Sequence, residues 1–228
     1  MTKRPGSPAR VAAGRRKPLS RDRVLRAAIR LADVGGLDAV TLRKLGQELR
    51  VEAMSLYRHV ASKDDILDGT ADLITSEFDV PSADGDWKPA IRRSVISAHE
   101  VLLRHPWAGS VIESRRTAGP ARLRYLDAVV GRLSGAGFPM PIVIRAIMAL
   151  DSHTYGFVLQ ELAWPFGVED APATAEAFAS GLPAREYPNV LALAEMVAAA
   201  QHGVPVEFEF GLDLILDGLA RSLTASAG

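Results

Sequence analysis

Apolar residues recur at helical spacing along most of the chain and show no sustained two-residue alternation of the strand type. The first stripe covers residues 21–34, where Ser20 is a candidate N-cap and Gly35-Gly36 ends the helix. Shorter stripes follow at residues 41–49 and around Leu56, and a longer one spans 63–79. This pattern predicts an all-α protein.

The stretch TLRKLGQELRVEAMSLYRHVASK at residues 41–63 predicts two short helices joined by a tight turn, followed by the start of a third. Leu45 and Leu56 belong to the buried side of this unit, and Gly46 stands where the second helix must cross the first. The residues left outward are small or polar, which suits a helix tip that enters a DNA major groove. They are Ala53, Met54, Ser55, Arg58 and His59.

The helix predicted at 63–79 connects this unit to the rest of the chain. Ser62 and Asp65 have the spacing of a capping box, and Lys63 falls in the first turn, where an ammonium and free N–H groups can hold a phosphate. We therefore expect a disordered basic arm at 1–19, a three-helix helix-turn-helix head at 20–65, and a helical body at 66–228.

The body shows helical patterns separated by Pro and Gly. The predicted helices cover residues 88–104, 106–113, 120–135, 141–163, 187–202 and 207–224. The Ala/Pro/Gly-rich segment 165–186 between them is expected to be a partly ordered loop.

Two of these helices, 141–163 and 207–224, carry more apolar residues than the surface of a monomer needs. We expect them to meet their symmetry mates in a four-helix interface of a homodimer. The alternative is that both are buried core helices of a single chain. The expected interface residues are Tyr155, Leu159, Phe208, Leu212, Ile215 and Leu219.

Charge is divided sharply along the chain. Residues 1–63 hold 15 Lys and Arg against 5 Asp and Glu, whereas residues 64–228 hold 12 against 22. A basic head suits a polyanion such as double-stranded DNA, because each neutralised phosphate releases a counterion. The chain has no Cys, no recognisable signal peptide and no apolar run expected to span a bilayer, so a cytoplasmic protein without a membrane partner is predicted.

Enzyme signatures are missing: the sequence contains no HExxH, GxSxG, Walker loop or dinucleotide fingerprint, and no spaced histidine pair. Neither catalysis, a metal nor a cofactor is expected. A pocket among the body helices would bind a bulky, mostly apolar molecule, although core packing explains the same residues without a ligand. The candidate lining residues are Leu102, His105, Trp107, Val111, Ile112, Leu126, Met148, His153 and Trp164.

The string VTLRKLGQELRVEAMSLYRHVASKDDILD at residues 40–68 resembles the DNA-binding domain of the TetR family of bacterial transcriptional regulators. Further along, LLRHPWAG, GAGF, YGFVLQE and FEFGLDLILDGL resemble, in the same order, parts of the tetracycline repressor subfamily. The resemblance implies a homodimer on a palindromic operator, a small-molecule inducer in the larger domain, and a connecting helix at 63–79 that changes the spacing of the two heads.

The same resemblance implies that Arg43 contacts a guanine edge, and that Tyr57, His59 and Lys63 hold phosphates. The full set of residues expected at the DNA is Thr41, Arg43, Ala53, Met54, Ser55, Tyr57, Arg58, His59 and Lys63.

The sequence departs from the family pattern at several positions. Arg50 stands where the turn usually has Gly, so either its backbone accepts a left-handed or otherwise strained conformation or the turn itself differs. Ile112, Gln160 and Ser94 replace the histidine, glutamate and asparagine of the tetracycline–magnesium site, and we therefore exclude that complex as the inducer.

A ligand-responsive transcriptional regulator, most simply a repressor, is the function predicted. The alternative is a constitutive, architectural DNA-binding protein that has no physiological ligand. A cavity of several hundred cubic ångströms beneath the helix at 63–79 would distinguish the first from the second.

Overall fold

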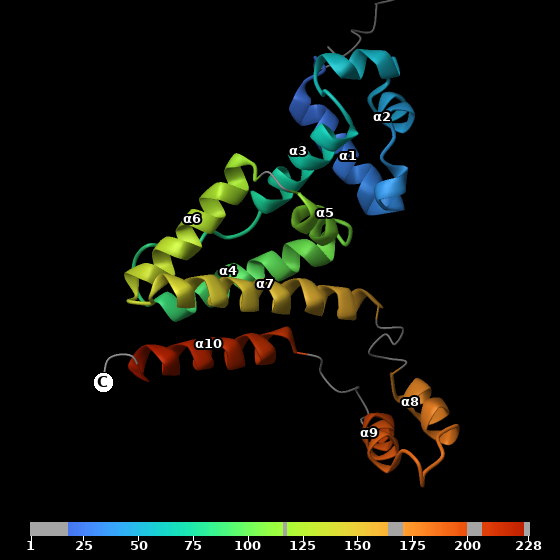
Figure 1. Ribbon diagram of the computed structural model, residues 1–228. Coiled ribbons are helices and arrows are strands. Elements are labelled where there is room, and N and C mark those ends of the chain that lie inside the picture. The colour runs from blue at the N-terminus through green and yellow to red at the C-terminus, as the bar shows by residue number, and fades with distance from the viewer. Residues whose placement is uncertain (1–17, 116–117, 164–170, 200–206, 226–228) are drawn as a thin grey trace, which may run out of the picture.

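The structure is a computed structural model of the 228-residue chain and describes residues 18–115, 118–163, 171–199 and 207–225. Every regular element in these ranges is a helix, which confirms the all-α prediction (Figure 1). The elements are α1 (Arg21–Gly35), η1 (Leu37–Ala39), α2 (Leu42–Leu49), η2 (Ala53–Arg58), α3 (Lys63–Thr75), α4 (Trp87–Arg104), α5 (Ala108–Ser114), α6 (Pro120–Gly135), α7 (Met140–Ala163), α8 (Ala171–Ser180), α9 (Pro188–Ala199) and α10 (Phe208–Ala225). The expected arm at 1–19 lies outside the described residues, except for Pro18 and Leu19.

Helix α2 is held by caps at both ends. The Thr41 side chain accepts a hydrogen bond from the backbone N–H of Lys44 at 3.2 Å. Arg50, the C-cap, has φ 55° and ψ 50°, so the left-handed backbone predicted for it is present. Between the caps, a Cβ on Gly46 would lie 2.9 Å from the carbonyl oxygen of Val51, and only glycine allows the turn to pass so closely.

Replacing Arg50 with Gly is expected to raise the free energy of unfolding by about 1 kcal/mol, because a side chain at a left-handed position costs roughly that much. The same substitution at Arg124, on the exposed face of α6, is expected to lower it by about 1 kcal/mol, because glycine weakens a right-handed helix. Urea denaturation of both variants measures the difference. Equal destabilisation by the two glycines would contradict the strain assigned to Arg50.

Three elements differ from their sequence-based prediction. The recognition segment η2 is a 3-10 helix, with Ser55 N–H bonded to Glu52 O, because six residues are too few for a stable α-helix of their own. Helix α3 ends at Thr75 rather than near residue 79. The expected loop at 165–186 contains α8, an Ala-rich helix whose Pro172 lies in the first turn, where proline needs no donor.

Helix α3 joins the head to the body. Its first half packs against α1, and a Cβ on Gly69 would come within 2.7 Å of the Leu25 side chain. It also packs against α5 and α6 of the body. The core around α3 is continuous, since Val24 and Leu56 of the head belong to the same buried cluster as Leu102 and Val111 of the body.

A second core lies between α4, α6, α7 and α10, where Leu133, Val143, Leu150 and Leu212 are buried together. Helix α10 runs beside α7 (Figure 1) and is fixed to α4 by ion pairs. Arg92 of α4 contacts Asp213 at 2.7 Å and Glu209 at 2.6 Å, and hydrogen bonding to Arg92 lowers the pKa of Asp213. The α8–α9 hairpin stands apart from this bundle in the same view.

Helix α7 corrects one expectation about membranes. Its 24 residues are long and apolar enough to cross a bilayer by length and composition, so the statement that no segment qualifies is wrong. The charged residues Arg145 and Asp151 are too few to make this helix polar enough to fail the test. Its contacts with α4, α6 and α10 instead place it in the bundle, with one face left to solvent.

Candidate DNA-binding surface and ligand cavity

The side chains predicted to meet DNA gather at the turn between α2 and η2 and at the start of α3. Thr41, Arg43, Arg58 and Lys63 are exposed, as are Met54 and Tyr57, whose exposed fractions are 74% and 48%. The remaining three, Ala53, Ser55 and His59, are partly buried. Two large apolar side chains so exposed on a short segment indicate a contact surface rather than a folded core.

Two of these residues have no competing interaction. Among the described residues, Arg43 and Arg58 have neither a hydrogen-bond partner for the guanidinium nor an ion pair, so their charge is available to a ligand. The Ser55 hydroxyl, by contrast, donates to Glu52 O at 2.6 Å and retains only its acceptor capacity for a base edge.

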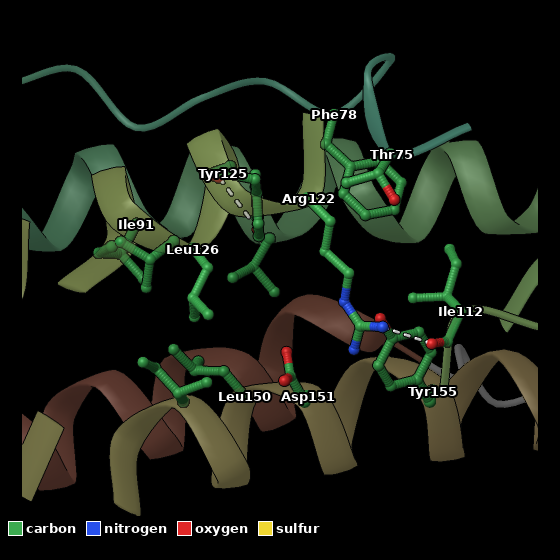
Figure 2. A pocket seen from close by; sticks show the side chains of 14 residues that line it. Thr75, Phe78, Ile91, Ile112, Arg122, Tyr125, Leu126, Leu150, Asp151 and Tyr155 are labelled. Atoms are coloured by element: carbon green, nitrogen blue, oxygen red, sulfur yellow. Dashed lines mark hydrogen bonds between the residues drawn. The ribbon is translucent and has the colours of Figure 1, made fainter. Parts of the chain in front are cut away.

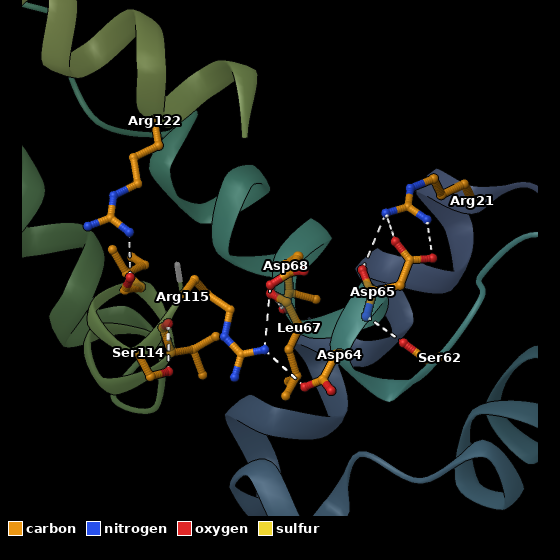
Figure 3. A network of polar contacts seen from close by, with 12 residues as sticks. Arg21, Ser62, Asp64, Asp65, Leu67, Asp68, Ser114, Arg115 and Arg122 are labelled. Atoms are coloured by element: carbon orange, nitrogen blue, oxygen red, sulfur yellow. Dashed lines mark hydrogen bonds and ion pairs between the residues drawn. The ribbon is translucent and has the colours of Figure 1, made fainter. Parts of the chain in front are cut away.

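An ion pair fixes the orientation of this surface. The guanidinium of Arg21 in α1 binds the Asp65 carboxylate of α3 in bidentate geometry, at 2.6 and 2.7 Å. Asp65 also accepts the N–H of Ala61 at 2.8 Å, while Ser62 caps α3 by accepting from Asp65 N–H (Figure 3). Hydrogen bonding to Arg21 lowers the pKa of Asp65, which keeps the carboxylate charged.

Farther along α3, two contacts join the head to the body. Arg115, directly after α5, lies 3.0 Å from Asp64 and 3.5 Å from Asp68 (Figure 3). The Asp72 carboxylate accepts the N–H of Ala121 at 2.8 Å and so caps α6 from outside that helix. The region that follows α5 and the start of α6 are therefore in direct contact with α3.

A third contact lies at the far end of α1. The Asp33 carboxylate accepts hydrogen bonds from His105 Nδ1 at 2.8 Å and from Trp107 Nε1 at 2.7 Å. Both residues were predicted to line the ligand pocket, and neither does. Their polar atoms instead connect the loop between α4 and α5 to the head.

A cavity of about 210 Å³ lies between α3, α4, α6 and α7 (Figure 2). The side chains around it are mostly apolar, with two charged groups, Arg122 and Asp151, among the described residues. Its walls are formed by Thr75, Phe78, Ile91, Ser94, Val95, Ile112, Arg122, Tyr125, Leu126, Val129, Ile147, Leu150, Asp151 and Tyr155. The cavity reaches the C-terminal end of α3 through Thr75.

Several polar groups of the cavity already form hydrogen bonds within the chain. Arg122 donates from Nη1 to Ile112 O at 2.5 Å, and its Nη2 lies 3.5 Å from a carboxylate oxygen of Glu113. Ser94 donates to Asp79 O at 2.6 Å, and its hydroxyl lies 3.2 Å from that of Tyr125. Burial raises the pKa of Tyr125 to about 12 and also raises the pKa of Tyr155, so both phenols stay neutral.

Asp151 is the exception, because no hydrogen bond or ion pair joins its carboxylate to the described residues. Burial raises its pKa to about 6; Glu113 adds to the rise and Arg122 opposes it. A raised carboxyl pKa means that the unfolded chain releases this proton at lower pH than the folded chain does. Asp151 therefore lowers the free energy of unfolding progressively as the pH rises from about 4 to 6. Above pH 6 the whole of this destabilisation is present.

Replacing Asp151 with Asn is expected to remove this penalty. The variant should match the parent at pH 4 and exceed its free energy of unfolding at pH 8 by an amount on the order of 2 kcal/mol. Urea denaturation across this pH range measures the effect. Asp127→Asn on the exposed face of α6 is the control, with no pH-dependent gain expected, and a gain from Asp151→Asn equal at pH 4 and pH 8 would contradict the assignment.

Most residues predicted to line the pocket lie away from this cavity. Only Ile112 and Leu126 reach the cavity. Leu102 and Val111 are buried in the core shared with the head, while Met148 is 62% exposed on the outer face of α7. Trp164 lies outside the described residues.

His153 was also predicted to meet the ligand but packs under α10. Its ring stacks on Phe208 at 4.8 Å and its Nε2 donates to Phe208 O at 2.9 Å. The ring of His99 stacks on Phe208 as well, at 4.0 Å. A Cβ on Gly211 would lie 2.4 Å from the His153 ring, so this close contact depends on glycine.

The predicted dimer residues separate into two groups. Phe208 and Leu212 are buried within the chain, Ile215 and Leu219 pack against the same core, and Tyr155 lines the cavity. Of the six, only Leu159 is largely exposed, at 65%. The prediction chose the stripe of α10 that packs within the chain; the exposed apolar residues of α10 are Phe210 and Leu214, at 67% and 57%.

The cavity residues that the sequence did not indicate include three polar groups: Arg122, Asp151 and Tyr125. One signal was present, since a lone acid in the apolar run of α7 is unusual unless it is paired or functional. Nothing in the local sequence of α6 distinguishes Arg122 from the exposed arginines beside it.

Comparison with known proteins identifies the head and the body together. Residues 24–70 match the family described as bacterial regulatory proteins, tetR family, and residues 81–223 match the tetracyclin repressor-like C-terminal domain. The chain belongs to the TetR family. It is 35% identical over 212 residues to an HTH-type transcriptional regulator of Saccharopolyspora erythraea, covering 91% of this chain and 88% of that protein.

Other relatives of this TetR-family chain are named repressors. It is 30% identical to the HTH-type transcriptional repressor DrrR1 of Streptomyces coeruleorubidus, covering 90% of this chain and 79% of that protein. It is 31% identical to the class A tetracycline repressor from transposon 1721 of Escherichia coli, covering 87% of this chain and 89% of that protein. The chain is thus a TetR-family transcriptional regulator, and these relatives are regulators rather than enzymes.

A solved structure shares the fold over nearly the whole chain. ActR of Streptomyces coelicolor in complex with (S)-DNPA has a TM-score of 0.75 at 25% identity, covering 90% of this chain and 99% of that one. ActR has also been solved with actinorhodin, with a TM-score of 0.74. The resemblance to the TetR family noted in the sequence is therefore confirmed.

Proposed function

We propose that this protein is a ligand-gated repressor that binds a palindromic operator in the cytoplasm as a homodimer and is released when a small molecule fills the cavity. The observation that carries the proposal is the position of α3. Its first turn holds the head through Asp65 and Arg21, and its last residue, Thr75, lines the cavity.

The contacts of α3 support coupling between the two sites. A ligand in the cavity contacts α6 and the end of α3, and α6 begins on Asp72 of α3. A ligand that prefers a shifted position of these helices changes the population of DNA-competent heads only by its difference in affinity for the two states. A difference of a few kcal/mol is sufficient to empty an operator.

The exposed apolar surface supports a homodimer. Ile144 and Met148 of α7 are 57% and 62% exposed, and Phe210 and Leu214 of α10 are exposed to a similar degree. A soluble monomer does not keep two adjoining helix faces this apolar. Packing α7 and α10 against their symmetry mates would bury these faces in a four-helix interface.

The α8–α9 hairpin offers a second apolar surface to a partner subunit. Its two helices pack mainly on one another, and Phe178, Leu193 and Met196 are all more than half exposed. Its position apart from the bundle of its own chain (Figure 1) leaves these residues available to the other subunit.

At the DNA, we assign base contacts to Arg43 and Met54 and phosphate contacts to Tyr57, His59 and Lys63. The free guanidinium of Arg43 is suited to a guanine edge, and Met54 to a thymine methyl group. Lys63 adds its ammonium to the free N–H groups at the start of α3.

The cavity of about 210 Å³ is smaller than the several hundred cubic ångströms expected of a ligand-gated regulator, so its chemistry rather than its size argues against an architectural DNA-binding protein. A cavity with an unpaired carboxylate costs stability, and a protein that binds no ligand gains nothing from it. ActR, which has a similar fold, has been solved with two different small molecules.

Selection from a random double-stranded DNA library tests the DNA-binding part of this proposal. The enriched sites should be palindromes whose half-sites lie one helical turn or a multiple of it apart. Sedimentation velocity on the protein with one enriched site should give two protomers per duplex. Enrichment of sites without two-fold symmetry, or a monomer on each duplex, would contradict the proposal.

A further inference from the structure

We propose that the cavity selects a small organic cation, with an apolar or aromatic body and a protonated amine that pairs with the carboxylate of Asp151. The inference rests on the proposed function in taking this cavity as the effector site, and it adds the chemical class of the effector.

The charges around the cavity are not balanced. Arg122 has an acidic partner in Glu113, at 3.5 Å, and it donates to the carbonyl oxygen of Ile112. Asp151 projects from α7 into the same space (Figure 2) without a partner among the described residues. One negative charge therefore remains uncompensated, and a cationic ligand is the species that compensates it.

The walls offer donors in Arg122 and the phenols of Tyr125 and Tyr155, and they also offer acceptors that suit a cation. The Thr75 hydroxyl donates to Ala71 O at 2.9 Å, and the Ser94 hydroxyl donates to Asp79 O. These two hydroxyl groups can still accept a hydrogen bond from a ligand, and an ionised Asp151 can do so as well. A protonated amine has donors only, which matches these acceptors, whereas a carboxylate ligand has no donors and would face Asp151 with the same charge.

Aromatic rings provide the rest of the fit. Phe78, Tyr125 and Tyr155 line the cavity, with Phe78 and Tyr125 in edge-to-face contact at 5.4 Å. The faces of such rings attract ammonium groups. The volume of about 210 Å³ lies below the usual range for drug-sized ligands, so the ligand is compact: one ring with a short side chain fits, and a large polycyclic molecule does not.

Three probes of nearly equal size separate charge from shape: 2-phenylethylamine as the cation, 2-phenylethanol as the neutral form and phenylacetate as the anion. Isothermal titration of the full-length protein at pH 8 is expected to give the tightest binding for the amine, with a Kd on the order of 1 mM for so small a probe. The affinity for the amine should exceed the affinity for the alcohol by about tenfold or more, as expected for a hydrogen bond to a charged group.

Asp151→Asn keeps the shape of the side chain and removes its charge, so it should abolish the preference for the amine while the alcohol still binds. Asp127→Asn, the same change on the exposed face of α6, should keep the preference. The stability of the Asp151→Asn variant at pH 8 shows independently that it is folded.

The inference is overturned if the wild-type protein binds the three probes equally, prefers phenylacetate, gives no heat with the amine, or keeps its preference after Asp151→Asn. Operator binding is measured separately by mobility shift. Selection of the amine by a protein that binds no operator would contradict the repressor proposal alone, whereas operator binding without selection of the amine would contradict only the ligand class.

Discussion

Arg43→Ala is expected to abolish sequence-specific DNA binding while leaving the fold and the dimer intact. Arg43 is exposed beside the turn and its guanidinium has no partner among the described residues, so its removal disturbs no internal contact. A bidentate contact to guanine contributes about 1–3 kcal/mol of discrimination, and a homodimer makes the contact twice. Affinity for the selected operator should fall on the order of 10²- to 10⁴-fold.

Fluorescence anisotropy at fixed salt, with the operator and a scrambled duplex, measures this loss. Arg26→Ala is the matched control, since Arg26 lies on α1 and pairs with Asp22 at 3.0 Å on the helix surface. The control removes the same charge from the head and should lower both affinities slightly and equally. An Arg43→Ala protein that still distinguishes operator from scrambled DNA would refute the base contact.

Leu214→Glu is expected to convert the protein to a monomer and to weaken operator binding by at least about 100-fold. Leu214 is 57% exposed in the single chain but central to the proposed interface, where a carboxylate from each subunit would lose its hydration. Like charges brought together across an interface cost several kcal/mol. A monomer then contacts only one half-site.

Sedimentation velocity at micromolar concentration measures the change in mass. Leu123→Glu is the control: Leu123 is 54% exposed on α6, outside the α7–α10 faces, and its variant should remain a dimer. A Leu214→Glu protein that stays dimeric would place the interface elsewhere.

The head could be predicted from sequence because its determinants are local. Leu45 and Leu56 are fully buried at the positions that the helical stripe indicates, and Gly46 lies against Val51 O as the crossing of the two segments requires. The left-handed Arg50 follows from the tight turn itself. Each of these inferences needs only neighbours within about ten residues.

The body could be predicted only as a set of helices. Helix α10 carries two apolar stripes, and periodicity alone does not tell which one faces its own chain: Leu212 is fully buried and Leu214, two residues on, is exposed. For the same reason Met148 was assigned to the pocket. Its true neighbours depend on the rotation of α7, which is set by packing against α4 and α10.

The cavity depends on the tertiary structure in a stronger sense. Phe78, Arg122 and Asp151 come from three separate segments, and no spacing along the chain indicates that they meet. The tetracycline–magnesium site was excluded on its substitutions. Ile112 and Ser94 do lie on the cavity wall, whereas Gln160 is exposed at the surface.

The continuous core that runs from Val24 to Val111 has a consequence for how such proteins can be recombined. A DNA-binding head whose core contains only its own residues can be transferred to another body as a module. This head completes its core with Leu102 and Trp107 of the body, and its α1 ends on a carboxylate shared with that loop. A chimera that joins it to a relative's effector domain must therefore carry the docking residues of α4 and α5 along with the head.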